Sequence, residues 1–439
     1  MKVVDASLGL TVWAVCGLLL GSPQAQAAPV VAAPPISMPA GQTGSPMEVK
    51  LAQGRAAIAK RDFARADALF KEAMGLDRKS PLPLLSLAES ARVRNEPAVA
   101  KQRLGEALAL TPRHPPTLRA WALWHFAHAE YPKAVEFWQA ALAADPSYAA
   151  VLVDLGDYHF NINDKPEIAG EFYLRALAID PKLAGAQYAM GMVMLRSGKL
   201  DDAFKRFGES ARLSPGNALP LAAMAQVHVL QKDNTRALTM YEQALGAQPD
   251  YYAARLSKAD ILLAGGKTQL ALAEYGKVAK GFPKVAAAHL GAGMAAQQLG
   301  QNEAALRSYQ AAIALQPDNV LALNNAAWIA AEGAGVADGG LAWARKAAAL
   351  APQEPRVQGT LAWVLHKRGE TGPAIQSLEL LMKGAGREFA EPHYLLGRML
   401  ADKGDTARAM AELREALRIN PNFGQAADAA ARLRKLEKS

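Results

Sequence analysis

Apolar residues recur at helical spacing from about residue 47 to residue 423, in segments separated by short polar turns. Each segment has a single apolar stripe, so it can cover that stripe only by packing against another segment. The turns contain glycine among polar residues, as at residues 196–199 and 403–405, which suits the end of a helix. The pattern predicts an all-helical protein built from consecutive helix pairs.

A longer pattern returns about every 34 residues in the same region. A small residue is followed twelve positions later by alanine, then by a bulky residue, a second alanine and a proline. The clearest copy has Gly293, Ala305, Tyr309, Ala312 and Pro317. The copies start at Met47, Pro81, Pro115, Ala149, Ala184, Ala218, Tyr252, Ala286, Val320, Pro355 and Ala390. The chain is therefore predicted to hold eleven repeats over residues 47–423.

This pattern resembles the tetratricopeptide repeat family, whose helix-turn-helix unit follows the form W-x2-L-G-x2-Y, then A-x3-F, then P. The resemblance implies a right-handed α-solenoid of about eleven repeats. Three copies depart from it by one extra residue, and Arg78 and Gly386 stand where proline is expected. The segment 332–340 has four glycines, which predicts a loose turn within the ninth copy.

Elementary packing explains the residue types of each copy. The small residue lets the two helices approach where they cross, and the bulky residue, as at Phe70, Trp138, Tyr173 and Phe207, fills the next layer. Proline follows the second helix because it cannot continue that helix but can begin the next one. Residues 424–439 are predicted to form a capping helix with a basic tail, since an array needs a polar end.

The first 46 residues differ in composition from the repeats. Residues 1–27 have the three parts of a secretory signal, so we expect cleavage after Ala27 and a periplasmic or exported protein. A retained anchor and a lipoprotein attached at Cys16, the single cysteine, are the alternatives. Residues 28–46 contain five prolines and read as an extended linker. After cleavage no transmembrane segment is expected.

The chain has a formal net charge of +8, but its Lys and Arg residues alternate with Asp and Glu and form no block. Nucleic acid is therefore not an expected partner. The densest basic group is the tail Arg432, Arg434, Lys435 and Lys438, which would suit a weak contact with an anionic lipid or polysaccharide.

No residue pattern typical of catalysis or cofactor binding is complete in this sequence. Residues 265–268 read Gly-Gly-Lys-Thr, yet the upstream glycine of a phosphate loop is replaced by Ile261. His125 and His128 lie three residues apart without a carboxylate or cysteine partner, so packing is favoured over a metal site. We expect a non-enzymatic protein without a cofactor or metal.

The first helix of each copy is expected to line the concave side of the array. In the middle copies this side is small or apolar, as at Leu256 and Met294, and suits an apolar peptide. In the last three copies it becomes polar and aromatic, with Asn324, Asn325, Trp328, Arg356, Trp363 and Arg398 as candidate partner-binding residues. The family resemblance implies that Asn324 or Asn325 grips a peptide backbone, while capping or solvation is the alternative for both. We expect alanine at Trp328 and Trp363 to abolish binding with little effect on melting.

The last three copies are also similar to long exported tetratricopeptide proteins of bacterial exopolysaccharide assembly and surface-protein sorting. Two functions follow as hypotheses. The first is a periplasmic scaffold that binds a protein or peptide of the envelope export machinery. The second is a module that binds an acidic polysaccharide during export.

Overall fold

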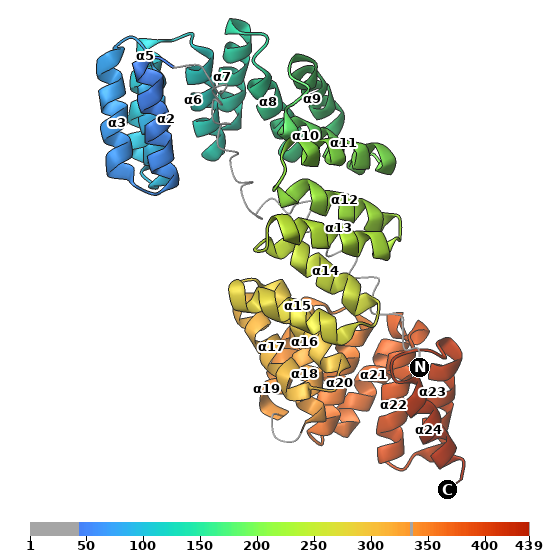
Figure 1. The fold of residues 1–439 in the computed structure, drawn as a ribbon. Helices are drawn as coiled ribbons and strands as arrows, with labels where there is room; N and C mark the ends of the chain where they lie inside the picture. Colours follow the sequence, from blue (N-terminus) through green and yellow to red (C-terminus); the bar gives the residue numbers. More distant parts are fainter. Residues whose placement is uncertain (1–43, 334–336, 439) are drawn as a thin grey trace. The chain divides into compact units, whose positions relative to one another are not determined.

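The computed structural model describes residues 44–333 and 337–438, and every regular element in these ranges is helical. Figure 1 shows the helices as consecutive pairs. The chain divides into two compact units, with the boundary between Gln231 and Lys232. The predicted signal and the linker up to residue 43 lie outside the described residues.

The N-terminal unit contains five helix pairs and the first helix of the sixth. Its helices are α2 (Pro46–Ala59), α3 (Phe63–Leu76), α4 (Leu82–Val93), α5 (Pro97–Leu110), α6 (Pro115–Ala127), α7 (Tyr131–Ala144), α8 (Ala149–Asn161), α9 (Pro166–Ile179), α10 (Ala184–Arg196), α11 (Leu200–Leu213) and α12 (Ala218–Leu230).

The C-terminal unit begins with the second helix of the sixth pair and ends with an unpaired helix. Its helices are α13 (Asn234–Ala247), α14 (Tyr252–Ala264), α15 (Thr268–Gly281), α16 (Ala286–Gln298), α17 (Asn302–Leu315), α18 (Val320–Glu332), α19 (Ala337–Leu350), α20 (Pro355–Lys367), α21 (Thr371–Met382), the 3₁₀ turn η1 (Ala385–Glu388), α22 (Ala390–Asp402), α23 (Thr406–Ile419) and α24 (Ala426–Leu436). The described residues therefore hold eleven helix pairs and one terminal helix, which confirms the predicted helical repeat fold.

Short polar and proline-containing segments set the helix ends. Ser45 and Glu48 form a capping box at the start of α2, and Asp62 accepts a hydrogen bond from the backbone N–H of Arg65 at the start of α3. Pro115 and Pro355 occupy the first turn of their helices, where the missing N–H would have no helical partner. Gly198, with φ of +72°, takes the left-handed conformation that ends α10.

The core of each pair is built around small residues and one large side chain. The mid-helix alanines of the second helices, including Ala203 and Ala305, are fully buried, and Phe207 and Tyr309 pack beside them with no exposed surface. Phe70, Trp138 and Tyr173 are buried in the same way, as the repeat pattern predicts. The glycines of the first helices lie directly against these rings. A Cβ on Gly54, Gly156, Gly191 or Gly293 would come within 2.2 to 2.6 Å of an aromatic carbon of the paired helix.

The connection between the tenth and eleventh pairs is irregular. The second helix of the tenth pair, α21, has 12 residues, whereas most second helices have 14. It is followed by η1, which contains Gly386 at the place where other copies have proline. This 3₁₀ turn brings the backbone carbonyl of Arg387 within hydrogen-bond distance of His393 on α22.

Within each of the two units, most helices pack mainly on their neighbours in the chain, as a repeat array requires. The terminal helix α24 packs on α23 through its apolar side. Leu433 and Leu436 lie on that side, so α24 caps the last pair. Within the described ranges, we find no helix with both the length and the apolar character needed to span a bilayer.

Candidate partner-binding face

The first helices of the last three copies, α18, α20 and α22, pack side by side in the C-terminal unit. We call the surface that they form the C-terminal first-helix face. All six candidate residues lie on these helices: Asn324, Asn325 and Trp328 on α18, Arg356 and Trp363 on α20, and Arg398 on α22. The repeat frame therefore assigns them to adjacent helices, and their side-chain contacts decide which of them form one cluster.

Trp363 is the centre of this cluster and has no exposed surface. Its Nε1 donates a hydrogen bond to Glu332 Oε1 at 2.7 Å. The ring of Trp328 stacks on the Trp363 ring, with centroids 6.0 Å apart. The Arg398 guanidinium lies 3.9 Å from the centroid of the Trp363 ring, a cation–π contact that joins α22 to α20. Trp363 thus holds the three first helices together.

Arg398 also joins the cluster to the terminal helix. Its Nη1 donates to the Tyr394 hydroxyl at 3.2 Å and lies 3.7 Å from Glu332 Oε1. The Tyr394 hydroxyl donates in turn to Asp428 Oδ2 at 2.7 Å, and Arg432 Nε donates to the same oxygen at 2.5 Å. The polar network therefore runs from α18 to α24.

Burial controls the titration of this network. It raises the pKa of the Tyr394 hydroxyl to about 12, together with the hydrogen bond that the hydroxyl donates to Asp428. Burial also opposes ionisation of Asp428, but hydrogen bonds from Tyr394 and Arg432 outweigh it and lower the pKa of that carboxyl. Asp428 is therefore a carboxylate at neutral pH, and Arg398 and Arg432 balance its charge.

The two asparagines occupy different environments. Asn325 is partly buried, and its Nδ2 donates to the Tyr309 hydroxyl at 3.3 Å, while that hydroxyl donates to Gln297 Oε1 at 2.6 Å. Asn324 is 7% exposed, and among the described residues its buried Oδ1 has no hydrogen-bond partner. Neither side chain caps α18, because Asn319 accepts the capping hydrogen bond from the N–H of Ala322.

The six candidates differ in what they can offer to a partner. Arg356 is exposed, and Asn325, Trp328 and Arg398 are partly exposed, so these four side chains can be contacted from solvent. Trp363 and Asn324 are buried and can only position their neighbours. Arg356 also lies seven residues before Trp363, about 10 Å along α20. Binding by these four residues stays a prediction, whereas direct contact with Trp363 would require the core to open.

The structure adds residues that the sequence analysis did not select. Glu332 accepts the hydrogen bond from the Trp363 indole, and the Tyr394 hydroxyl accepts one from Arg398. The Lys367 ammonium lies 5.4 Å from the centroid of the Trp363 ring. Glu332 and Tyr394 occupy positions 13 and 5 of their copies, both of which the repeat frame assigns to the same side as Asn324. A search of every such position would have found them.

The N-terminal unit has its own buried polar group on its first helices. Arg119 of α6 donates two hydrogen bonds to Asp154 of α8, at 2.6 and 2.9 Å. Asp157, one turn further along α8, accepts a 2.7 Å hydrogen bond from the Tyr173 hydroxyl. Burial raises the pKa of Asp157 to about 7, in spite of this hydrogen bond. The Arg119–Asp154 pair links the third and fourth copies and balances its own charge, whereas the Asp157–Tyr173 hydrogen bond joins the two helices of the fourth copy.

The histidines and tryptophan that the sequence offered as alternative sites make packing contacts within the third copy or with the second copy. His125 stacks on Trp121 and Phe137, and its Nδ1 lies 2.9 Å from Glu130 Oε2. The His128 ring stacks on the Trp124 ring with centroids 4.0 Å apart, and the Lys101 ammonium lies 4.8 Å from the centroid of the same indole. In residues 44–333 and 337–438, no three His, Cys, Asp or Glu side chains are arranged to hold a metal ion.

Comparison with known proteins agrees with the repeat frame. Residues 119–184, 222–286 and 290–355 match one family model and residues 390–423 match another, and both are described as tetratricopeptide repeat. Together these matches cover just over half of the chain.

Individual relatives are distant. The chain is 24% identical over 180 residues to anaphase-promoting complex subunit 3 of Schizosaccharomyces pombe, a match of 41% of this chain and 27% of that protein. Among solved structures, the hetero-tetramer Cut9-Hcn1 of the anaphase-promoting complex is 15% identical, with a TM-score of 0.44, and covers 90% of this chain and 96% of its own. YrrB, described as a tetratricopeptide protein with an unusual peptide-binding site, is 25% identical with a TM-score of 0.34, over 42% of this chain and 95% of its own.

Proposed function

Because the chain belongs to the tetratricopeptide repeat family, we propose that it is a non-enzymatic scaffold that binds an extended segment of a partner protein on the C-terminal first-helix face. Trp328 and Arg356 would contact the segment directly. Trp363 and Glu332 would hold the side chains of Trp328 and Arg398 in place through the contacts described above.

One observation carries this proposal, namely the stack of Trp328, Trp363 and Arg398 across three successive first helices. Tryptophan and arginine side chains dominate the binding energy of many interfaces, above all where their conformations are fixed before binding. Here the buried Trp363 fixes both neighbours, so little conformational entropy would be lost when a partner orders them. Asn325 adds an amide that could pair with a peptide backbone group.

The test compares two tryptophans of the ninth copy. Trp328 lies on the first helix α18, whereas Trp343 lies on the second helix α19, and both are partly buried. Full-length protein carrying Trp328→Ala or Trp343→Ala would be used to capture proteins from an envelope extract, with quantitative mass spectrometry of the captured set. We expect specific proteins to be lost with Trp328→Ala and retained with Trp343→Ala.

Melting temperatures of both variants must be measured alongside, since both changes remove packed atoms. A captured set that is the same for the two variants and for the unchanged protein would refute binding at this face. Treatment of the extract with protease distinguishes a protein partner from the alternative, an acidic polysaccharide, because only the second would survive it.

We further propose that the protein acts in the periplasm in envelope assembly or export. The signal-like pattern of residues 1–27 supports this location. Amino-terminal sequencing of protein purified from the native envelope tests it. A first residue of Ala28 is the expected result, whereas an intact Met1 would contradict it.

A further inference from the structure

A recurring bridge ties the start of a copy to the turn before it. In the fifth copy, Gln187 Nε2 donates to the carbonyl of Pro181, and Gln187 Oε1 accepts from Arg206. In the seventh copy, Arg255 donates both to the carbonyl of Pro249 and to Glu274. Each bridging residue is the fourth of its copy and joins a carbonyl six residues earlier to a side chain 19 residues later.

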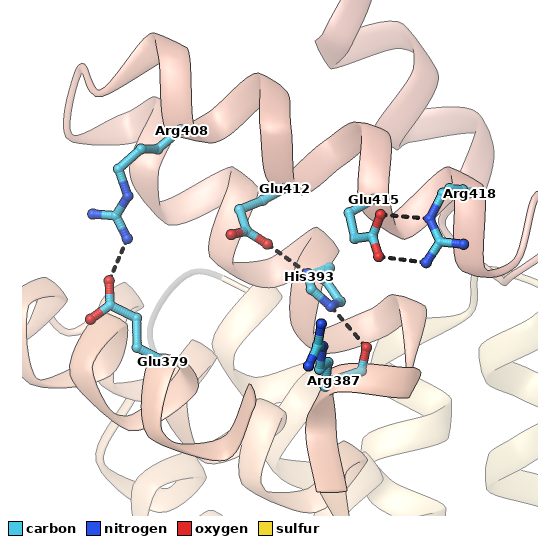
Figure 2. Close-up of polar contacts among 7 residues, drawn as sticks. All are labelled: Glu379, Arg387, His393, Arg408, Glu412, Glu415 and Arg418. Atoms are coloured by element: carbon cyan, nitrogen blue, oxygen red, sulfur yellow. Dashed lines mark hydrogen bonds and ion pairs between the residues drawn. The ribbon is translucent and has the colours of Figure 1, made fainter. Parts of the chain in front are cut away.

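The eleventh copy has the same bridge, but histidine provides it. His393 Nδ1 lies 2.6 Å from Glu412 Oε2 of α23, and Nε2 lies 3.1 Å from the carbonyl oxygen of Arg387 in η1. Figure 2 shows the imidazole between these two groups. A carbonyl oxygen and a carboxylate oxygen only accept hydrogen bonds, so both contacts are complete only when both ring nitrogens carry a proton. The geometry therefore fits the imidazolium form.

Most charged side chains on the elements around His393 form ion pairs with other residues. On α23, Glu415 accepts two hydrogen bonds of 2.7 Å from Arg418 and also faces His393. Glu379 of α21 is paired with Arg408 of α23, as Figure 2 shows. On α20, Gly359 lies against Leu395 of α22. His366, also on α20, makes a hydrogen bond with Asp402 at the C-terminal end of α22, away from His393. Glu412 and the Arg387 carbonyl are thus the direct partners of the ring.

These partners decide the protonation of His393. Burial is the strongest single influence and lowers its pKa. The hydrogen bonds to Glu412 and to the Arg387 carbonyl, with the charges of Glu412 and Glu415, outweigh burial and raise the pKa of His393 above its ordinary value of 6.5. A group whose pKa is raised by folding stabilises the folded state below its ordinary value and loses that effect as the pH rises through the folded value.

We propose that His393 is a proton-dependent fastener that ties η1 to α23 and so secures the eleventh copy to the tenth. In its doubly protonated form it holds both acceptors. Loss of one proton leaves either the carbonyl or the carboxylate without a donor, and the turn between the two copies is then held on one side only. The equivalent bridges at Gln187 and Arg255 lack this response, because neither side chain changes charge near neutral pH.

Two substitutions copy the natural alternatives and test the proposal in the full chain. His393→Arg reproduces the permanently charged bridge of the seventh copy, and His393→Gln introduces the uncharged residue of the fifth. The readout is hydrogen exchange of the amides of Arg387 and Phe389, which bond to the carbonyls of Gly384 and Gly386. Exchange is compared at pH 6.0 and pH 8.5 after correction for the intrinsic effect of pH.

In the unchanged protein we expect protection of these amides to fall about tenfold between the two pH values, the effect of losing one charge-assisted hydrogen bond. His393→Arg should keep high protection at both values, and His393→Gln should have low protection at both. A control is His289→Gln, because His289 makes the same contact with the carbonyl of Pro283 but has Ser308 at the position of Glu412. This control should leave the exchange of η1 unchanged.

A second measurement covers the case in which a variant fails to fold. The imidazole of His393 in the unchanged protein is titrated by NMR, and a midpoint above 6.5 is expected. A midpoint at or below 6.5, or an η1 protection that has the same pH dependence with His393→Arg as without it, would overturn the proposal.

Discussion

Gly293 and Tyr309 meet across the two helices of the eighth copy, so closely that a Cβ on Gly293 would lie 2.6 Å from two carbons of the ring. Gly293→Ala should therefore force the buried ring to move and reduce the free energy of unfolding by about 1 to 3 kcal/mol. Gly276→Ala in the neighbouring helix α15 is the matched control, because a Cβ there meets nothing within 4 Å. Thermal melts of both variants check this, and the control should be neutral or slightly stabilising.

Gly276 occupies a helical position like Gly293, so this control separates overpacking from helix propensity. Equal losses of stability in the two variants would show that the contact with Tyr309 is not the cause.

Trp363→Ala should lower the free energy of unfolding by about 3 to 5 kcal/mol. The side chain is fully buried, and its loss would leave a cavity and remove the indole donor from Glu332. The expectation that Trp363 can be removed with little effect on melting is therefore replaced by the opposite one. Urea unfolding measures the loss, and Trp328→Ala should cost clearly less because that side chain is only partly buried.

Asp157→Asn should stabilise the N-terminal unit at pH 8, by roughly 2 to 4 kcal/mol. Burial raises the pKa of Asp157 to about 7 from an ordinary value of 3.8, so the unfolded chain releases this proton at lower pH than the folded protein does. The penalty on folding grows as the pH rises from about 4 to 7. Asparagine removes it and can still accept the hydrogen bond from Tyr173. Melting curves of both proteins at pH 4.5 and pH 8 test this, since the gain should fall to about 1 kcal/mol at pH 4.5, which lies only slightly above the ordinary pKa of 3.8.

Arg119→Ala should destabilise the N-terminal unit by about 3 to 5 kcal/mol, because Asp154 would stay buried without its cation. Lys205→Ala provides the comparison. Lys205 pairs with Asp202 at 3.7 Å with both side chains largely exposed, so its loss should change stability by less than about 1 kcal/mol. Similar losses in both variants would mean that the Arg119 pair is no more buried in solution than the Lys205 pair.

The repeat pattern predicted the helices well because a few residues determine each copy. The small residue at the helix crossing, as at Gly191, lies against the ring of the paired helix and so fixes the frame of its copy, whereas proline occurs in the first turn of first and second helices alike. Predicting the depth of burial was harder. Asn324 and Asn325 are adjacent and both polar, yet one is buried and the other partly exposed, because their surroundings come from the neighbouring helices.

The contacts of Trp363 and His393 show a second limit. A periodic pattern assigns Trp363 to the face of the first helices, but its burial depends on Arg398 from the next copy and Glu332 from the previous one. The bridge of His393 depends on η1, an irregular turn that no repeat pattern anticipates. Comparison of the fourth residues of the copies finds Gln187, Arg255 and His393 among the polar ones, but it does not identify the groups that they bind.

The arrangement in which each copy is fastened mainly to its neighbours also determines how the chain would respond to mechanical tension. A pulling force applied at the C-terminus would act directly on α24 and the eleventh copy. Their attachment includes the bridge between η1 and α23, which His393 completes. The force needed to detach the last copy should therefore be larger in acidic than in alkaline solution. The mechanical strength of this attachment would then depend on the proton concentration.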